Sequence, residues 1–464
     1  MEKKGRLKDR RIAQKDVSFH NRRRFDRRLN IDDFKKLLFS AKKERIPGKS
    51  RVVITGIGVV APNGVGKDQF WDNLSKGVSG VRPISTFNVD KYNSKTAGEI
   101  VDFDATHYLG KKGLRSLDRS TILIDTATKL ALNDSGITIT EKNTYDMGVV
   151  VGTTMGSVSS ISEFDKSGLI DGPSYVNPSF FPNTVINSPA SHASIMFDIR
   201  GLNATISNGY CSALTAAVYA YDSINLNKIS TVFVGAVEEF CKHTFLGFYK
   251  AGCLASANSK QKLIEQSVPF DKRRNGLVLG EGAGVVVFEE LEHAVERKAI
   301  IYGEVLGFAK TYDPDQNSNK YHLKVDGTVR AMQQALKMSN LSTESVDLIC
   351  ASANSTKMID LIETKAVKKV FSKKAASIPI TAVKSMLGEG YSVSGNLQMI
   401  AALLAINKGI IPPTLNYQEK DTYCNLDYVP NKCRNAKVNK VMINSISPNG
   451  NSVSFIIGKC LIHH

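Results

Sequence analysis

The stretch of residues 201–217, GLNATISNGYCSALTAA, limits the fold more than any other part of the sequence. Residues 204–207 alternate and include β-branched side chains, which favours a short buried strand. The Asn-Gly pair at 208–209 is a turn signal, and from Ser212 onward small, helix-forming residues follow. The stretch therefore predicts a strand, a tight turn that carries Cys211, and a buried helix.

Cys211 lies where an enzyme would place a nucleophile. The N-terminus of a helix offers unpaired N–H groups and a positive dipole, which lower the pKa of a thiol and can hold an oxyanion. The alternative is that Cys211 is a small buried residue of a central helix, the more common role of a free cysteine. From this stretch alone, the second interpretation is favoured.

Length and composition indicate a globular protein. The 464 residues suffice for a large core and two domain-sized halves, and 42% hydrophobic with 23% charged residues is ordinary for a soluble chain. No apolar run reaches the roughly 18 residues of a membrane span, and no secretory signal is visible. The cysteines are odd in number and form no CxxC pair; they lie at positions 211, 241, 253, 350, 424, 433 and 460. We therefore expect reduced thiols in the cytoplasm and no metal site.

Residues 1–50 hold most of the positive charge. They contain 18 Lys/Arg and seven Asp/Glu, hence +11 of the total formal charge of +17. A nucleic-acid arm, a membrane-surface helix and a docking arm for an acidic protein are all open alternatives. A solvated, partly disordered tail is at least as well supported. We treat 1–50 as a basic N-terminal extension and expect no nucleic-acid partner for the chain.

From residue 51 onward, apolar β-branched runs alternate with helical segments. The runs cover 52–60, 147–156, 231–236 and 285–288. Runs that are apolar on both sides predict an α/β fold whose strands are covered on both faces. The first run contains a Gly-x-Gly, but no third glycine follows at the dinucleotide spacing, so no cofactor is expected.

The pattern of strands then repeats. Later runs echo the earlier ones in the same order; they cover 301–308, 346–351, 378–386, 441–446 and 453–457. The sequence therefore predicts two topologically similar halves, about 51–297 and 298–460.

Several long blocks carry a family resemblance. In chain order they are 52–64 (VVITGIGVVAPNG), 180–207, 269–294 (PFDKRRNGLVLGEGAGVVVFEELEHA), 360–371 (DLIETKAVKKVF) and 383–395 (VKSMLGEGYSVSG). Together they resemble the β-ketoacyl-acyl-carrier-protein synthases of the thiolase-like superfamily over nearly all of 51–460. The resemblance implies a thiolase-like fold of two similar halves in a five-layer α-β-α-β-α arrangement. It also implies acyl transfer and condensation, with acyl carrier protein as a partner.

In that family a cysteine takes the acyl chain as a thioester, and two histidines assist decarboxylation of a malonyl unit and hold the enolate oxygen. A lysine orders the histidines, and a Gly-Phe-Gly loop gates the site. The chemistry combines a covalent nucleophile with oxyanion stabilisation. The flanking residues 201–203 and 212–214 both place Tyr210 in the nucleophile position. Cys211 is one residue along, a rotation of about 100° on a helix.

The family histidines are also replaced. By the matching blocks, their positions fall on Ser352 and Glu389, whereas the lysine is retained as Lys384. A serine can donate a hydrogen bond but cannot act as the base, and an ionised glutamate would repel an enolate. An ion pair between Lys384 and Glu389 is expected instead. The gating loop falls on Ser447, Pro448 and Asn449.

The resemblance is strongest to chain-length factors, family members that lack the nucleophile and pair with a competent ketosynthase. This implies a heterodimer that shapes the acyl tunnel in type II polyketide, polyene or fatty-acid-like biosynthesis. Whether the chain is itself an enzyme stays open at this point. One alternative is an active synthase that performs decarboxylative Claisen condensation with Cys211, as a homodimer or heterodimer. Another is a scaffold whose residues 1–50 recruit acidic carrier protein.

Overall fold

The computed structural model describes residues 50–257, 264–314 and 324–461. The predicted basic extension, 1–50, lies outside the described residues except for Ser50. The fold described below is that of the unit formed by residues 46–464.

The first half of the large sheet contains five strands besides the short β2 (Gly64–Val65), which pairs with β1. In sheet order they are β6 (Asn203–Ile206), β5 (Met147–Gly152), β7 (Thr231–Glu238), β8 (Gly282–Glu290) and β1 (Val52–Ala61). β5 is parallel to β6 and β7, whereas β8 is antiparallel to both β7 and β1. Nearly every residue of β1, β5, β7 and β8 is buried, as expected for strands covered on both faces.

The second half of the sheet repeats this topology. Its order is β11 (Ile380–Thr381), β10 (Leu348–Cys350), β14 (Lys440–Ile446), β15 (Asn451–Gly458) and β9 (Gly303–Tyr312). β10 is parallel to β11 and β14, and β15 is antiparallel to β14 and β9. The two halves join where β1 and β9 pair antiparallel over two residue pairs. The predicted similarity of the two halves is confirmed.

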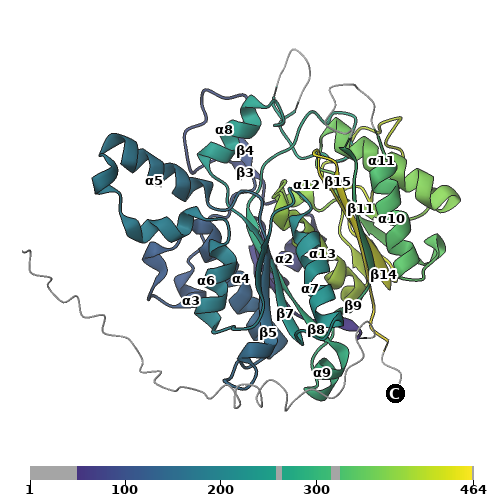
Figure 1. The fold of residues 1–464 in the computed structure, drawn as a ribbon. Helices are drawn as coiled ribbons and strands as arrows, with labels where there is room; N and C mark the ends of the chain where they lie inside the picture. Colours follow the sequence, from purple (N-terminus) through teal and green to yellow (C-terminus); the bar gives the residue numbers. More distant parts are fainter. Residues whose placement is uncertain (1–49, 258–263, 315–323, 462–464) are drawn as a thin grey trace, which may run out of the picture. The chain divides into compact units, whose positions relative to one another are not determined.

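Two helices lie between the halves of the sheet (Figure 1). α7 (Ser212–Asn225) contacts strands of both halves, and so does α13 (Ser392–Lys408), which also packs on α7. α13 is buried from Ser392 to Ile406 around its whole circumference. A helix without a polar face is stable only when it is surrounded by protein, so α13 occupies the central layer.

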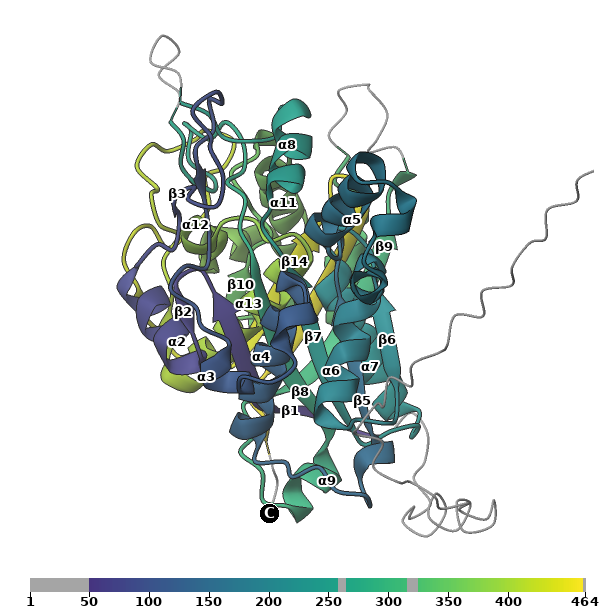
Figure 2. The ribbon, with the colours of Figure 1, turned by 90° about the vertical axis from the view of Figure 1, so that its left-hand side faces the viewer.

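Other helices cover the outer faces of the sheet. α4 (Arg119–Ser135) and α6 (Ser188–Phe197) pack on the first half, and Figure 2 views this side directly. α10 (Asp326–Met338) packs on the second half and is joined there by α11 (Lys357–Phe371). Helix, sheet, helix, sheet and helix follow one another, which confirms the expected five-layer arrangement.

The remaining described elements are short strands, peripheral helices and the short buried helix α12. They are β2 (Gly64–Val65), β3 (Arg82–Pro83), β4 (Thr96–Ala97), β12 (Ile410–Ile411), β13 (Arg434–Asn435), α2 (Lys67–Lys76), α3 (Thr106–Leu109), α5 (Val158–Ile170), α8 (Lys242–Lys250), α9 (Leu291–Glu296) and α12 (Lys384–Leu387), with short 3₁₀ turns that include η3 (Pro173–Tyr175) and η4 (Pro178–Thr184). In the described part of the chain, every helix falls short of the length and apolarity that crossing a membrane demands.

Gly58 allows β1 to lie against α4, and its replacement tests this packing. A Cβ at Gly58 would overlap the carbonyl oxygen of Ala127 and lie 2.6 Å from the nitrogen of Ala131. Because backbone atoms cannot move aside like a flexible side chain, we expect Gly58→Ala to lower the free energy of unfolding by about 3 kcal/mol. Urea unfolding followed by circular dichroism measures the change.

Gly247 provides a matched control for the same substitution. It is exposed on α8, and a Cβ there would meet nothing within 4 Å. Gly247→Ala should therefore raise helix stability by roughly 0.5–1 kcal/mol. Equal midpoints for the two variants would contradict the close approach of β1 and α4.

Candidate functional site

The predicted strand, turn and helix around Cys211 are present. β6 ends at Ile206, the turn passes through Gly209 with φ 56°, and α7 begins at Ser212 with Cys211 as its N-cap residue. The hydroxyl of Ser445, on β14, donates to the carbonyl oxygen of Tyr210 at 2.7 Å and fixes the turn to the second half of the sheet. The start of α7 is therefore a further point, besides the pairing of β1 with β9, at which the two halves are linked.

Cys211 is fully buried and its thiol is engaged. Its Sγ donates to the carbonyl oxygen of Ser445 at 3.3 Å and lies 3.6 Å from that of Asn451. Burial raises the pKa of the Cys211 thiol to about 12 and outweighs the opposing influence of the Lys384 charge. The lowered pKa that the catalytic alternative requires is absent, because desolvation of a thiolate this deep dominates over a helix dipole, and the favoured interpretation of a small buried residue agrees with the structure.

Tyr210 fills the space beside Cys211 with an aromatic ring. Its ring centroid lies 5.8 Å from that of Tyr391, whose ring in turn lies 4.9 Å from that of Phe248 at a tilt of 31°. Both tyrosines are buried, and this burial raises the pKa of each phenol well above its usual value. A phenol held neutral in this way is a poor nucleophile, and the position contains a packed aromatic cluster.

Ser352 lies on the loop after β10, and both its backbone and its hydroxyl have partners. Its N–H donates to Oε1 of Glu363 at 3.0 Å, and its Oγ accepts the N–H of Ile446 at 2.8 Å. Lys384 donates from Nζ to the Ser352 carbonyl oxygen at 2.8 Å. Burial raises the pKa of Glu363 to about 7. Ser352, at the first family histidine position, thus links the loop after β10 to β14 by a hydrogen bond.

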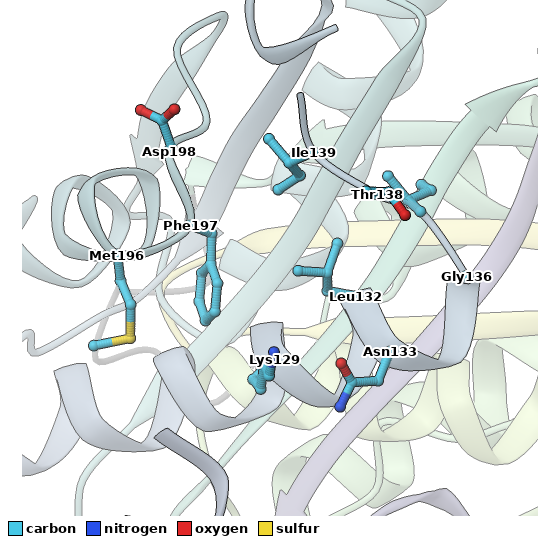
Figure 3. A pocket seen from close by; sticks show the side chains of 10 residues that line it. Lys129, Leu132, Asn133, Gly136, Thr138, Ile139, Met196, Phe197 and Asp198 are labelled. Carbon is cyan, nitrogen blue, oxygen red and sulfur yellow. The ribbon is translucent and has the colours of Figure 1, made fainter. Parts of the chain in front are cut away.

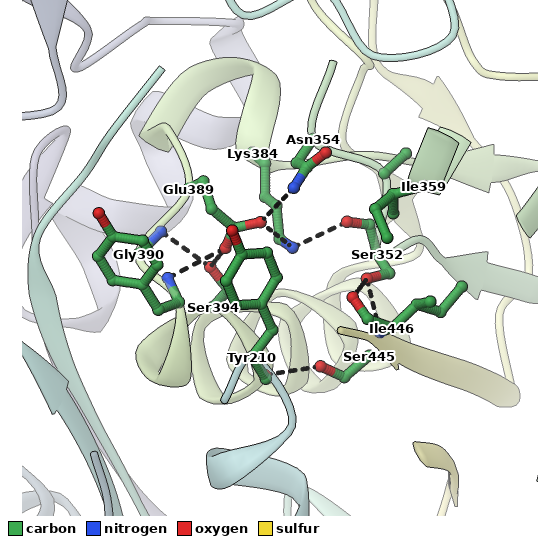
Figure 4. Close-up of polar contacts among 12 residues, drawn as sticks. Tyr210, Ser352, Asn354, Ile359, Lys384, Glu389, Gly390, Ser394, Ser445 and Ile446 are labelled. Atoms are coloured by element: carbon green, nitrogen blue, oxygen red, sulfur yellow. Dashed lines mark hydrogen bonds and ion pairs between the residues drawn. The ribbon is translucent and has the colours of Figure 1, made fainter. Parts of the chain in front are cut away.

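Glu389 forms the expected ion pair. Its Oε2 lies 2.9 Å from Nζ of Lys384, and both side chains are almost completely buried. Oε2 also accepts from Nδ2 of Asn354 at 2.9 Å, while Oε1 accepts from Oγ of Ser394 at 2.7 Å (Figure 4). The Tyr391 N–H donates to Oε1 at 3.0 Å. A carboxylate with four donors is a satisfied anion, and its negative charge would oppose an enolate.

The predicted gating residues Ser447, Pro448 and Asn449 form the turn between β14 and β15. The Ser447 N–H donates to the Asn451 carbonyl oxygen at 2.9 Å, and the Gly450 N–H donates to that of Ser447 at 3.0 Å. A Cβ at Gly209 would lie 2.8 Å from Oγ of Ser447, so this turn packs directly on the turn before α7. The structure brings the predicted loop to the site; its gating role stays a prediction.

Three polar groups of the site escaped the sequence analysis: Asn354, Ser394 and the backbone N–H of Tyr391. Asn354 is distant in sequence, and an isolated asparagine after a strand carries no signal of its partner. Tyr391 has φ 47°, a backbone conformation that is uncommon for a residue other than glycine, and it places its N–H over Glu389. In the sequence, the signal for this conformation was the position of Tyr391 directly after Gly390.

The polar partners described above contain no histidine, so the group lacks an imidazole base. Within the described residues, no three or more His, Cys, Asp or Glu side chains are arranged to hold a metal ion. An open hollow exists elsewhere on the surface, between the C-terminal parts of α4 and α6 (Figure 3). It is lined by Lys129, Leu132, Asn133, Gly136, Ile137, Thr138, Ile139, Met196, Phe197 and Asp198, none of which belongs to the buried site.

Comparison with known proteins identifies the family. Residues 49–294 match the model described as "Beta-ketoacyl synthase, N-terminal domain", and residues 302–418 match "Beta-ketoacyl synthase, C-terminal domain". The chain belongs to the beta-ketoacyl synthase family. The predicted division at residues 297 and 298 stays a prediction.

Curated relatives of this beta-ketoacyl synthase homologue include both fatty-acid and polyketide enzymes. The chain is 34% identical over 417 residues to "3-oxoacyl-[acyl-carrier-protein] synthase 2" of Coxiella burnetii, which covers 89% of this chain and 99% of the relative. It is 35% identical over 410 residues to "Tetracenomycin polyketide synthase ketoacyl synthase alpha subunit" of Streptomyces glaucescens, covering 85% and 93% of the two chains.

Solved structures agree with the thiolase-like fold. "The ishigamide ketosynthase/chain length factor" is similar with a TM-score of 0.81 and 30% identity, covering 89% of this chain and all of the other. The ketosynthase complex titled "AntDE:AntF (apo): type II PKS acyl-carrier protein in complex with its ketosynthase bound to the hexaketide" has a TM-score of 0.79 and 27% identity, covering 90% and 100%. The chain therefore has a ketosynthase-family role.

Proposed function

We propose that this chain is a non-catalytic partner of a catalytic ketosynthase, in the manner of a chain-length factor. In a heterodimer it would shape the tunnel in which an acyl chain grows, in type II polyketide, polyene or fatty-acid-like biosynthesis. The observation that carries the proposal is the exchange of three reactive groups at one buried point for Tyr210, Ser352 and Glu389. The cytoplasmic location and the absence of a cofactor stay predictions.

The chemistry at that point supports the proposal. Condensation needs a thiolate, a donor for the enolate and a base. Here the thiol of Cys211 has a pKa of about 12, the hydroxyl of Ser352 is held by β14, and Glu389 brings a negative charge. Each of these three groups is held by hydrogen bonds or an ion pair to its protein neighbours, which opposes a role in reaction with a substrate.

An exposed apolar surface supports a partner of similar fold. β6 is the last strand at one end of the sheet, and in the described part of the chain no strand pairs with its outer edge. The neighbouring elements α5, η3, η4 and α6 expose large apolar side chains: Leu169, Ile170, Tyr175, Phe181 and Ile195. We call these five residues the apolar face. Large apolar side chains exposed on neighbouring elements favour an interaction site, and a free sheet edge favours a partner that adds a strand.

The partner surface can be tested with charged substitutions. Leu169 and Ile195 are 86% and 76% exposed, so neither contributes to the core. We expect Leu169→Asp or Ile195→Asp to lower the yield of a co-expressed ketosynthase in affinity purification at least tenfold, since a buried unpaired carboxylate at an interface costs about 2–5 kcal/mol. Thermal midpoints of the isolated chain should be unchanged.

Ile300 is the matched control, because it is 67% exposed and lies outside the apolar face. Ile300→Asp should co-purify like the wild type. Equal yields for all three variants would show that pairing uses another surface.

The alternative function is an active condensing enzyme that uses Cys211, and its support is the position of that residue at the N-cap of α7. The deciding experiment compares malonyl decarboxylation and carbon–carbon bond formation by the chain alone, by the ketosynthase alone and by the pair. The proposal expects turnover only when the catalytic ketosynthase is present, and a product length that changes when this chain is exchanged. Turnover by the isolated chain would overturn it.

A further inference from the structure

The four donors around Glu389 come from three separate parts of the fold. Lys384 belongs to α12, Asn354 to the loop after β10, and the Tyr391 N–H and Ser394 hydroxyl to the start of α13. Their distances to the two carboxylate oxygens are all between 2.7 and 3.0 Å (Figure 4). Glu389 is 1% exposed, so all its hydrogen bonds are made inside the protein. We call this set of donors the carboxylate hole.

The donors are held in place by partners other than Glu389. Nζ of Lys384 also donates to the Ser352 carbonyl oxygen at 2.8 Å. Oδ1 of Asn354 accepts from the Thr356 hydroxyl at 2.7 Å, and Oγ of Ser394 accepts the Gly390 N–H at 3.0 Å. The hole is therefore preorganised, and its shape does not depend on the carboxylate that fills it.

The electrostatics of the hole favour an anion of one charge. A buried lysine that loses its counter-ion is strongly unfavourable, because the ammonium has already lost its water. The N-terminus of the 17-residue helix α13 adds a positive dipole at the same point. Two oxygens with two donors each match the geometry of a carboxylate group.

The backbone at Glu389 is anchored independently of its side chain. The Glu389 N–H donates to the Val278 carbonyl oxygen at 2.7 Å, and its carbonyl oxygen accepts the Gly280 N–H at 2.9 Å. Shortening the side chain therefore removes the anion while the chain around it keeps its hydrogen bonds.

We infer that the carboxylate hole is a binding site for a small monocarboxylate, which Glu389 occupies permanently as a tethered ligand. In the wild type the tethered group excludes free carboxylates. In Glu389→Ala the vacated hole takes formate or acetate, which restores the counter-ion of Lys384. This inference goes beyond the proposed function and does not rest on it, since it concerns the isolated chain and no partner.

The test is thermal unfolding of the full chain with sodium formate, with formamide as the neutral analogue and sodium chloride at equal ionic strength. Glu389→Ala should have a lower Tm than the wild type, and saturating formate should raise that Tm by about 3 °C. Formamide and chloride should not reproduce this rise, and formate should leave the wild type unchanged. An equal response of Glu389→Ala to all three additives, or of wild type and variant to formate, overturns the inference.

Two further variants complete the test. Glu389→Gln keeps the hole filled with a neutral group, and Lys384→Met combined with Glu389→Ala removes its cation; neither should respond to formate. If Glu389→Ala does not fold, the infrared difference spectrum between the wild type and Glu389→Gln at neutral pH tests whether the carboxyl group of Glu389 is ionised. An ionised carboxylate band supports a tethered anion, whereas a protonated carboxyl band overturns it.

Discussion

Iodoacetamide is expected to modify Cys433 of the native protein rapidly and to leave Cys211 unmodified. Cys433 is exposed, whereas Cys211 is fully buried with a thiol pKa of about 12. At pH 8 a thiol of that pKa is ionised on the order of a thousandfold less than an ordinary thiol of pKa about 8.5, and alkylation requires the thiolate. Peptide mapping by mass spectrometry over a time course gives both rates from one sample.

The pH dependence sharpens this experiment. Because burial raises the pKa of Cys211, its reaction should still be accelerating at pH 10, where an ordinary thiol is already almost fully ionised. In urea, where the chain is unfolded, the two cysteines should react alike. Native labelling of Cys211 at the rate of Cys433 would contradict the buried thiol and favour the condensing-enzyme alternative.

Lys384→Met is expected to lower the free energy of unfolding by about 3–5 kcal/mol, because it leaves the carboxylate of Glu389 buried without a cation. That is a large part of the roughly 5–15 kcal/mol that stabilises a native protein. Combining Lys384→Met with Glu389→Gln replaces the pair by two neutral groups, so the double variant should cost much less than the sum of the two single changes. Urea unfolding of the four proteins gives the coupling.

An exposed ion pair in the same chain serves as the control. Lys369 lies 2.8 Å from Asp326, and both side chains are more than half exposed. Lys369→Met should change stability by less than about 1 kcal/mol, because water screens the pair. If both lysine variants have the same stability, the buried pair contributes no more than a surface contact.

The elements of the fold were predictable where the signal is local. The strands of the first half and the helix after Cys211 follow from apolar runs, glycine turns and small helical residues. The repeat of strand order was predictable for the same reason. The pairing of Lys384 with Glu389 also followed from sequence, since Lys384 begins the short helix α12 and Glu389 follows two residues after its end.

The site was harder to predict because its partners are distant in sequence. Asn354 reaches Glu389 only after β10 and α12 have been brought together by the second half of the sheet. The sequence left two interpretations of Cys211 open because a helix start can be recognised in the sequence, whereas the depth of burial beneath β14 and β15 cannot. Amino-acid composition predicts neither the contact of Asn354 with Glu389 nor the burial of Cys211.

The open edge of β6 and the apolar face beside it have a consequence for how such a chain is produced. A strand with one free edge next to exposed apolar side chains is a template for self-association. If the proposed heterodimer covers this surface, each molecule of this chain made in excess of its partner would remain an unpaired subunit with the surface exposed. Matched synthesis of the two subunits would then limit aggregation, and expression of this chain alone should give a lower soluble yield than co-expression with its partner.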